Sequence, residues 1–134
     1  MGPWVDIANM NQSPSPPGAE LGKPHAWTGR PVLVTEFSFK ALHAGVPSDT
    51  SASLALPTQE DPAASLERYL DALVRLPFLV GYHWFQHSDQ PPTGRFDGES
   101  NNFGLVPNQD VPWRPVVDCL TQINFDSEAL HRNP

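Results

Sequence analysis

The chain has 134 residues, 39% of them hydrophobic, which is enough for one domain with a buried core. Its formal net charge is −7 at pH 7 and its basic residues do not cluster, which argues against nucleic acid and anionic membrane surfaces as partners. No apolar stretch reaches membrane-spanning length, and the start, Met1-Gly-Pro-Trp, is not typical of a signal peptide. The single cysteine, Cys119, excludes an internal disulfide and a cysteine-based zinc site, but it does not fix the compartment.

A weak strand pattern followed by prolines opens the chain. The segment WVDIANM (residues 4–10) predicts a short first strand. Four prolines and two glycines then stand between Asn11 and His25. An ordinary helix does not tolerate that spacing of prolines, so we expect a loop with room for one helical turn.

The stretch PVLVTEFSF (residues 31–39) predicts a buried strand. Its apolar run from Val32 to Val34 has no polar alternation, as in a parallel sheet that is covered by helices. The run ends on Thr35 and Glu36. A carboxylate at the carboxyl end of such a strand lies where barrel enzymes place catalytic groups. Glu36 can equally be a solvated strand end, since structural ion pairs also occupy such positions.

The clearest helical pattern follows residues 40–57, which we expect to form a surface loop. Asp61 can cap a helix, and Pro62 suits the first helical position. Apolar residues then recur at helical spacing: Leu66, Tyr69, Leu70, Leu73 and Val74. Pro77 ends this helix, and a second strand, Phe78 to Phe85, follows with almost no linker. We therefore expect a right-handed crossover between two parallel strands.

Aromatic and polar side chains crowd the end of this second strand: Tyr82, His83, Trp84 and Gln86. Aromatic surface beside hydrogen-bonding groups suits a sugar ring, although a core position is the commoner fate of a tryptophan. Because the carboxyl ends of parallel strands share one edge, Glu36 and Trp84 are expected at the same end of the sheet.

A polar loop and a last helix complete the chain. The loop, residues 88–106, can bind a sugar or a cation, or it can simply satisfy its own turns. A helix is predicted from Trp113 to Asn124, and Phe125 to Pro134 are expected to form a frayed tail. The sequence thus divides into a domain over residues 1–126 and a tail over 127–134. We predict no metal site, because the five histidines are poorly placed for joint ligation, and no cofactor, since the sequence has no glycine-rich phosphate loop.

The two strand-end motifs together resemble a known family. The segment PVLVTEFSFKA (residues 31–41) resembles the seventh strand of clan A glycoside hydrolase barrels, which ends in the catalytic nucleophile. The segment GYHWFQ (residues 81–86) and its following loop resemble the eighth strand, with agarase-like and family 42 β-galactosidase-like members the most similar. The resemblance implies an α/β fold, a partial TIM barrel of about three βα units equivalent to strands six, seven and eight, with long loops.

The resemblance also implies roles for individual residues. Glu36 corresponds to the nucleophile, and Trp84 corresponds to the aromatic residue under the sugar beside the scissile bond. Substrate-facing or loop-ordering positions correspond to five further residues: Tyr82, His83, Gln86, Asp89 and Glu99. The implied partner is a carbohydrate, either a β-galactoside or an agar-type oligosaccharide. A non-proline cis peptide is implied at Trp84–Phe85.

The chain departs from this family in length and in one catalytic group. A complete barrel takes about 250 residues, and the helix after strand six is expected to be replaced by the proline-rich loop. The Asn-Glu pair that ends strand four in the family, and supplies its acid/base, is absent. Retaining hydrolysis needs two carboxyl groups about 5 Å apart. We therefore expect a glycoside hydrolase fragment with little or no activity of its own.

Three alternatives stay open at this point, and with them the enzymatic status and the localisation of the chain. One of three other carboxylates can replace the missing acid: Asp89, Asp97 or Glu99. The chain can instead be a non-catalytic carbohydrate-binding or scaffolding piece. It can also be a truncated or metagenomic fragment without selected activity. In each case we expect a homo-oligomer, because the outer strands lack neighbours and the barrel interior, including Val32, Val34 and Val80, is expected to be exposed.

Overall fold

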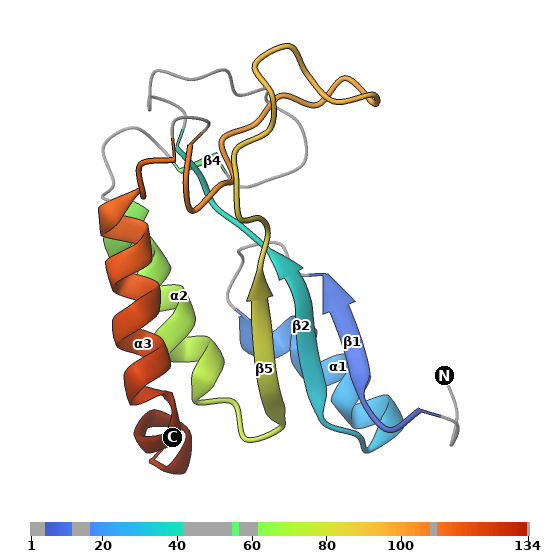
Figure 1. Ribbon diagram of the computed structural model, residues 1–134. Coiled ribbons are helices and arrows are strands. Elements are labelled where there is room, and N and C mark those ends of the chain that lie inside the picture. Colours follow the sequence, from blue (N-terminus) through green and yellow to red (C-terminus); the bar gives the residue numbers. More distant parts are fainter. Residues whose placement is uncertain (1–4, 12–16, 42–54, 57–61, 108–109, 134) are drawn as a thin grey trace.

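The computed structural model describes residues 5–11, 17–41, 55–56, 62–107 and 110–133. A three-stranded parallel sheet of order β1-β2-β5 lies at its centre (Figure 1). The strands are β1 (Ala8–Asn11), β2 (Val32–Phe37) and β5 (Leu79–Trp84). The helices are α1 (Pro17–Thr28), α2 (Pro62–Val74) and α3 (Arg114–Arg132). The predicted α/β fold with three parallel strands is therefore confirmed.

The hydrophobic core lies between the sheet and the helices. Helix α1 packs on β1 and β2, whereas α2 packs between α1, β5 and α3. The side chains that are almost wholly buried are Phe37, Leu21, Leu66, Leu70, Leu73, Val32 and Val34. They include the apolar positions of α2, so the stripe read from the sequence is the face that this helix buries. This packing fixes the three strands, and with them the positions of their carboxyl ends.

Helix α1 was missed by the sequence-based prediction, which expected a proline-rich loop here and no helix after the first strand. Pro17 stands at the first helical position, where a missing N–H removes no hydrogen bond. Only Pro24 lies inside the helix. An interior proline costs about 3 kcal/mol, but Leu21 is buried completely beneath the sheet and offsets much of this cost. The prediction was wrong because it counted prolines without regard to their helical positions.

The last helix is longer than the sequence indicated. Helix α3 continues to Arg132 and does not end near Asn124, so the expected frayed tail is helical through most of its length. His131 Nδ1 forms a 2.8 Å hydrogen bond with the Val74 carbonyl, and the side chain of Arg75 donates to the Asn133 carbonyl at 2.8 Å. These contacts join the end of α3 to the end of α2.

One expectation about the sheet faces also needs correction. Val32 and Val34 are not exposed, because both lie under the helices with 0% exposure. The uncovered face carries Leu33 instead, which pairs with Gly81. Val80 is 57% exposed, as expected. The two open edges of the sheet are β1 and β5, so the described strands form an open sheet and no closed barrel.

The expected surface loop after β2 is only partly described. Strands β3 (Lys40–Ala41) and β4 (Ala55–Leu56) form a short parallel pair within it, and residues 42–54 and 57–61 lie outside the described part. No helix in the described part of the chain is both long and apolar enough to cross a bilayer.

Candidate functional site

Polar side chains gather where β1 and β2 end. Asn11 is paired with Glu36 in the sheet register, and the Thr35 hydroxyl donates a 2.9 Å hydrogen bond to Asn11 Oδ1. Irregularities in register follow Met10 in β1 and Val34 in β2. Such bulges are frequent next to active sites, because they redirect side chains at strand ends. Glu36 is thus a half-buried carboxylate at the carboxyl end of the central strand.

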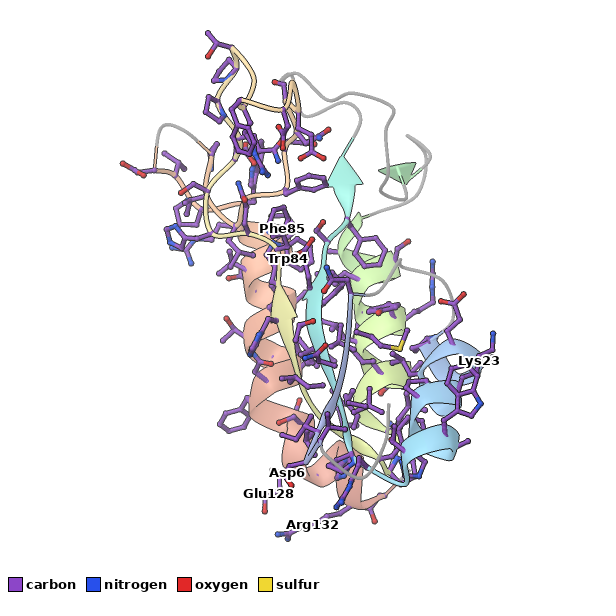
Figure 2. The ribbon with its side chains drawn as sticks, turned by 90° about the vertical axis from the view of Figure 1, so that its right-hand side faces the viewer. Asp6, Lys23, Trp84, Phe85, Glu128 and Arg132 are labelled. Carbon is purple, nitrogen blue, oxygen red and sulfur yellow. The ribbon has the colours of Figure 1, made fainter. Side chains whose placement is uncertain are left out.

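Trp84 closes the neighbouring strand β5 and pairs with Phe37 at the end of β2. Its ring meets the Phe37 ring edge-to-face, with centroids 5.4 Å apart. Its indole Nε1–H donates a 2.8 Å hydrogen bond to the Phe103 carbonyl. Figure 2 shows Trp84 and Phe85 together at the end of β5, under the long loop that leads to α3. The indole is therefore held on one side by the core and at its edge by the loop.

The loop between β5 and α3 folds back on itself. Its two limbs pair through backbone hydrogen bonds of 3.0–3.1 Å that run from Leu105 to Gln86, from Val106 to His87 and from Asp89 to Val106. Trp113 N–H donates to the Leu105 carbonyl at 2.9 Å, just before α3 begins. The two limbs of the loop are therefore held together by backbone hydrogen bonds beyond the carboxyl end of β5.

Asp89 lies inside this folded loop and is 6% exposed. Its Oδ1 accepts a 2.7 Å hydrogen bond from the Gly104 N–H. Burial raises the pKa of the Asp89 carboxyl above its ordinary value, while hydrogen bonds from Gly104 and the Trp113 side chain act in the opposite direction. Asp89 therefore orders the loop and does not face solvent.

Glu99 orders the outer part of the same loop. Its Oε2 accepts a 2.9 Å hydrogen bond from Gln90 Nε2 and lies 3.5 Å from the Arg95 guanidinium. Arg95 also pairs with Asp97 at 3.0 Å. All three carboxylates considered as replacements for the missing acid are thus engaged within the loop.

The three remaining predicted site residues have different surroundings. The ring of Tyr82 packs edge-to-face on Phe37, and its hydroxyl donates to Asn124 Oδ1 of α3. Burial raises the pKa of Tyr82 to about 12. His83 is exposed on β5, and Gln86 Nε2 donates to the nearby Ser88 carbonyl at 2.7 Å. The structure therefore brings Glu36, Trp84, Gln86 and Asp89 to one end of the sheet, while Tyr82 belongs to the helix-covered face.

Several residues at this end were not singled out from the sequence. Phe85 is half-buried and its ring meets Phe103 edge-to-face at 5.6 Å. The non-proline cis peptide lies at Phe85–Gln86, one residue after the expected position, so that expectation was wrong in register. Gly104 is a further missed residue, because its role depends on the close approach of Asp89, which a sequence pattern does not reveal.

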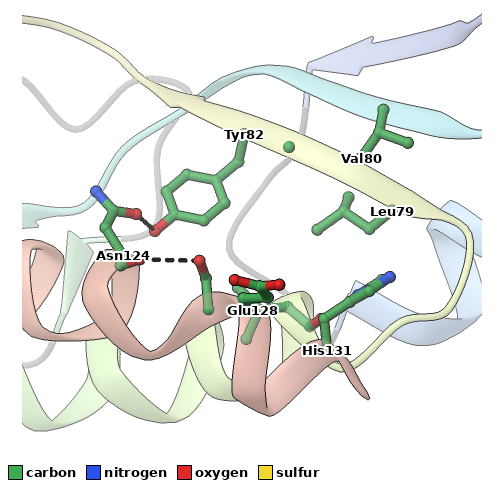
Figure 3. A pocket seen from close by; sticks show the side chains of 9 residues that line it. Leu79, Val80, Tyr82, Asn124, Glu128 and His131 are labelled. Carbon is green, nitrogen blue, oxygen red and sulfur yellow. Dashed lines mark hydrogen bonds between the residues drawn. The ribbon is translucent and has the colours of Figure 1, made fainter.

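Two cavities of similar size lie away from the strand ends. One of about 490 Å³ lies between β1 and α1 and is lined by Met10, Pro24 and Trp27 among others. The other, of about 480 Å³, lies between β5 and α3 (Figure 3). Its walls carry Leu79 and Val80 on one side and Glu128 and His131 on the other. Both cavities therefore open along the uncovered edges of the sheet. Among the described residues, no three histidine, cysteine, aspartate or glutamate side chains are placed to hold a metal ion.

Comparison with known proteins gives the context of this strand-end arrangement. The chain is 32% identical over 134 residues to beta-agarase B of Vibrio sp. (strain JT0107), an alignment that covers 96% of the chain. The chain resembles a segment of the beta-agarases. Beta-agarase A of the same strain is 35% identical over 96 residues, which cover 71% of the chain. No family model matches the chain.

Solved structures agree with the agarase similarity. The crystal structure of the agarase AgWH50C matches with a TM-score of 0.81 and 32% identity over 95% of the chain. An exo-beta-agarase matches with a TM-score of 0.83 and 27% identity over 96% of the chain. A GH2 beta-galacturonidase from Eisenbergiella tayi shares the fold at a TM-score of 0.60 and 17% identity.

The chain corresponds to only a part of these agarases. It spans 13% of the length of beta-agarase B, 9% of beta-agarase A, and 20% and 17% of the two solved agarases. Its homologues are therefore glycoside hydrolases, and the chain matches a segment of them that contains a three-stranded parallel sheet and three helices.

Proposed function

We propose that the chain is the part of an agarose-degrading glycoside hydrolase that carries the nucleophile, Glu36, and an aromatic sugar-binding surface at Trp84. The observation that supports this most strongly is the position of Glu36 at the carboxyl end of the central parallel strand, in a chain that matches agarases over nearly its whole length. Functional groups of barrel enzymes occupy that end of the sheet. The partner under this proposal is a carbohydrate of the agar type.

A second carboxyl group is required for the reaction. In retaining hydrolysis one carboxylate attacks the anomeric carbon, while a carboxylic acid about 5 Å away protonates the leaving oxygen. The three candidates in the loop are each engaged there, Asp89 through Oδ1 with Gly104 and both Asp97 and Glu99 with Arg95. The acid therefore has to come from outside this segment, and the chain alone has little or no hydrolytic activity.

The experiment that tests this proposal supplies the rest of the enzyme, including the acid that this segment lacks. A beta-agarase from which the matching segment has been deleted is mixed with the chain, and the release of reducing sugar from agarose is measured. Activity is expected with the wild-type chain and not with Glu36→Gln, which removes the nucleophilic charge with little change in shape. Glu67→Gln, on the exposed side of α2, is the matched control and should behave like wild type.

Two outcomes would overturn this proposal. Equal activity from wild type and Glu36→Gln would remove Glu36 from the nucleophile position. Robust turnover by the isolated wild-type chain, lost in Glu36→Gln, would show instead that an acid is present within the segment.

A non-catalytic carbohydrate-binding piece is the second candidate function. It is favoured by the fixed indole of Trp84, which is held at the strand end by the Phe103 carbonyl and by Phe37. In that case an agarose oligosaccharide binds with the same affinity to wild type and to Glu36→Gln, and binding is lost in Trp84→Ala. Titration followed by tryptophan fluorescence measures both effects.

A further inference from the structure

One peptide group in the long loop is hydrogen-bonded on both of its sides. Its carbonyl belongs to Phe103 and accepts the Trp84 indole N–H at 2.8 Å, and its N–H belongs to Gly104 and donates to Asp89 Oδ1 at 2.7 Å. The C=O and N–H of a planar trans peptide point in opposite directions. The Asp89 carboxylate and the Trp84 indole are therefore connected in a line through a single rigid group.

The surrounding chain leaves this peptide little room to move. A Cβ at Gly104 would lie 2.2 Å from the Asp89 backbone nitrogen and 2.5 Å from the Val106 carbonyl oxygen. The Phe103 carbonyl also accepts the Gln86 backbone N–H at 3.3 Å. Because Gly104 is buried, no water replaces the carboxylate at its N–H without opening the loop.

We propose that Asp89 is a positioning residue that orients the Trp84 indole through the Phe103–Gly104 peptide and does not itself touch the sugar. The inference rests on the proposed function, in which the Trp84 ring binds a sugar. An oxygen that accepts from the peptide N–H polarises the peptide group, which strengthens its carbonyl as an acceptor for the indole. A ring fixed before binding loses less conformational entropy when a sugar stacks on it.

The structure supports an indirect role for Asp89 over direct contact with substrate. The residue is 6% exposed, its Oδ1 accepts from Gly104, and its Oδ2, which has no hydrogen-bond partner among the described residues, is also buried. Its backbone N–H is also used, in a 3.0 Å hydrogen bond to the Val106 carbonyl. A sugar hydroxyl could reach the carboxylate only after the two limbs of the loop had separated.

The test is a measurement on the indole proton itself. The chain is labelled with ¹⁵N-tryptophan, and the Trp84 Nε1–H resonance is assigned with Trp84→Phe. Asp89→Ala is expected to shift this resonance and to speed its exchange with water, whereas Asp89→Asn, which keeps an acceptor oxygen, restores both. Asp118→Ala, on the exposed face of α3, is the matched control and should leave the resonance unchanged.

Sugar binding gives the second readout. Agarose-derived oligosaccharides are expected to bind Asp89→Ala with up to about tenfold lower affinity than wild type, in keeping with the contribution of a well-oriented aromatic contact. An unchanged indole resonance in Asp89→Ala overturns the positioning role, as does an Asp89→Asn variant that behaves like Asp89→Ala. Failure of wild type to bind any agarose oligosaccharide counts against the proposed function, while the indole measurement still decides the positioning role.

Hydrogen exchange in the wild-type chain tests the proposal without a variant, and it therefore applies even if Asp89→Ala does not fold. If one opening of the loop exposes both protons, the Gly104 amide and the Trp84 indole N–H are both strongly protected and exchange with the same protection factor. An indole proton that exchanges freely beside a protected Gly104 amide overturns the proposal.

Discussion

At the scale of single residues, two glycines have opposite environments and give a paired test. An added Cβ at Gly104 meets backbone atoms at 2.2 Å, whereas at Gly22, within α1, it meets nothing within 4 Å. Gly104→Ala is expected to destabilise the fold by about 1–3 kcal/mol, and Gly22→Ala to stabilise it by about 0.5–1 kcal/mol. Thermal unfolding followed by circular dichroism measures both. A wild-type melting temperature for Gly104→Ala would contradict the close approach of the two limbs of the loop.

The buried carboxyl of Asp89 predicts a pH dependence of stability. Burial raises its pKa in the folded state, so the folded protein binds this proton more tightly than the unfolded chain does. The resulting stabilisation is present at pH values below the unfolded pKa and is lost as pH rises through the folded pKa. We expect urea unfolding to show this decline for wild type and not for Asp89→Asn. Parallel pH profiles for the two proteins would contradict the assignment.

At the scale of elements, the sequence predicted those whose signal is local. The strand at Val32–Val34 and the apolar stripe along α2 were predicted correctly, because both follow from local hydrophobic patterns, whereas the predicted exposure of Val32 and Val34 was wrong. Glu36 and Trp84 were placed at one end of the sheet by chain direction alone. These predictions needed no knowledge of packing detail.

The face on which Tyr82 lies could not be read from the sequence. Val32 pairs with Leu79, but the next pair is Leu33 with Gly81, so Val80 is an extra residue in β5. One extra residue reverses which later side chains face the helices. Tyr82 and Trp84 therefore meet Phe37 on the covered side, and no local pattern marks the position of the bulge.

The end of α3 supplies a prediction at the element scale. Removal of residues 125–134 is expected to destabilise the chain by about 2–4 kcal/mol, because it removes the hydrogen bonds to Val74 and from Arg75 and the packing of Leu130. Urea denaturation measures the change. Phe125→Ala is the control. Because this side chain is 84% exposed, the substitution should change the free energy of unfolding by less than about 0.5 kcal/mol. A truncated chain as stable as wild type would mean that the helix end does not contribute.

At the scale of the whole molecule, the two edges of the sheet, formed by β1 and β5, are both unpaired among the described residues and lie beside apolar surface. Each outer strand borders a cavity, and exposed apolar side chains flank both: Ile7 and Trp27 near β1, and Val80 on β5. Unpaired strand edges beside apolar surface favour association with another chain. In a longer protein, neighbouring segments can cover these edges, and in the isolated chain only a second copy can.

We therefore expect the isolated chain to self-associate through its sheet edges, with an interface above about 1,000 Å². Size-exclusion chromatography with light scattering at micromolar concentration should show a dimer or a larger closed oligomer. Val80→Lys places a charge on the β5 edge and should shift the chain towards monomer. Phe96→Lys, at a side chain that is 96% exposed in the loop, is the control and should not. A stable wild-type monomer would rule out this association.

Two of the connections at the carboxyl ends of the strands are much longer than those at the amino ends. At the amino ends of the strands, Gly29 to Pro31 join α1 to β2, and Arg75 to Phe78 join α2 to β5. At the carboxyl ends, the chain from β2 to α2 spans residues 38–61, and that from β5 to α3 spans residues 85–113. Loops of this kind tolerate changes of length and sequence far better than short turns do. Length and sequence can therefore vary at this end of the sheet while the strands and helices keep their positions. Under the proposed function, exchanging the exposed residues 91–93 and 96–98 between relatives is expected to alter sugar preference without refolding the core.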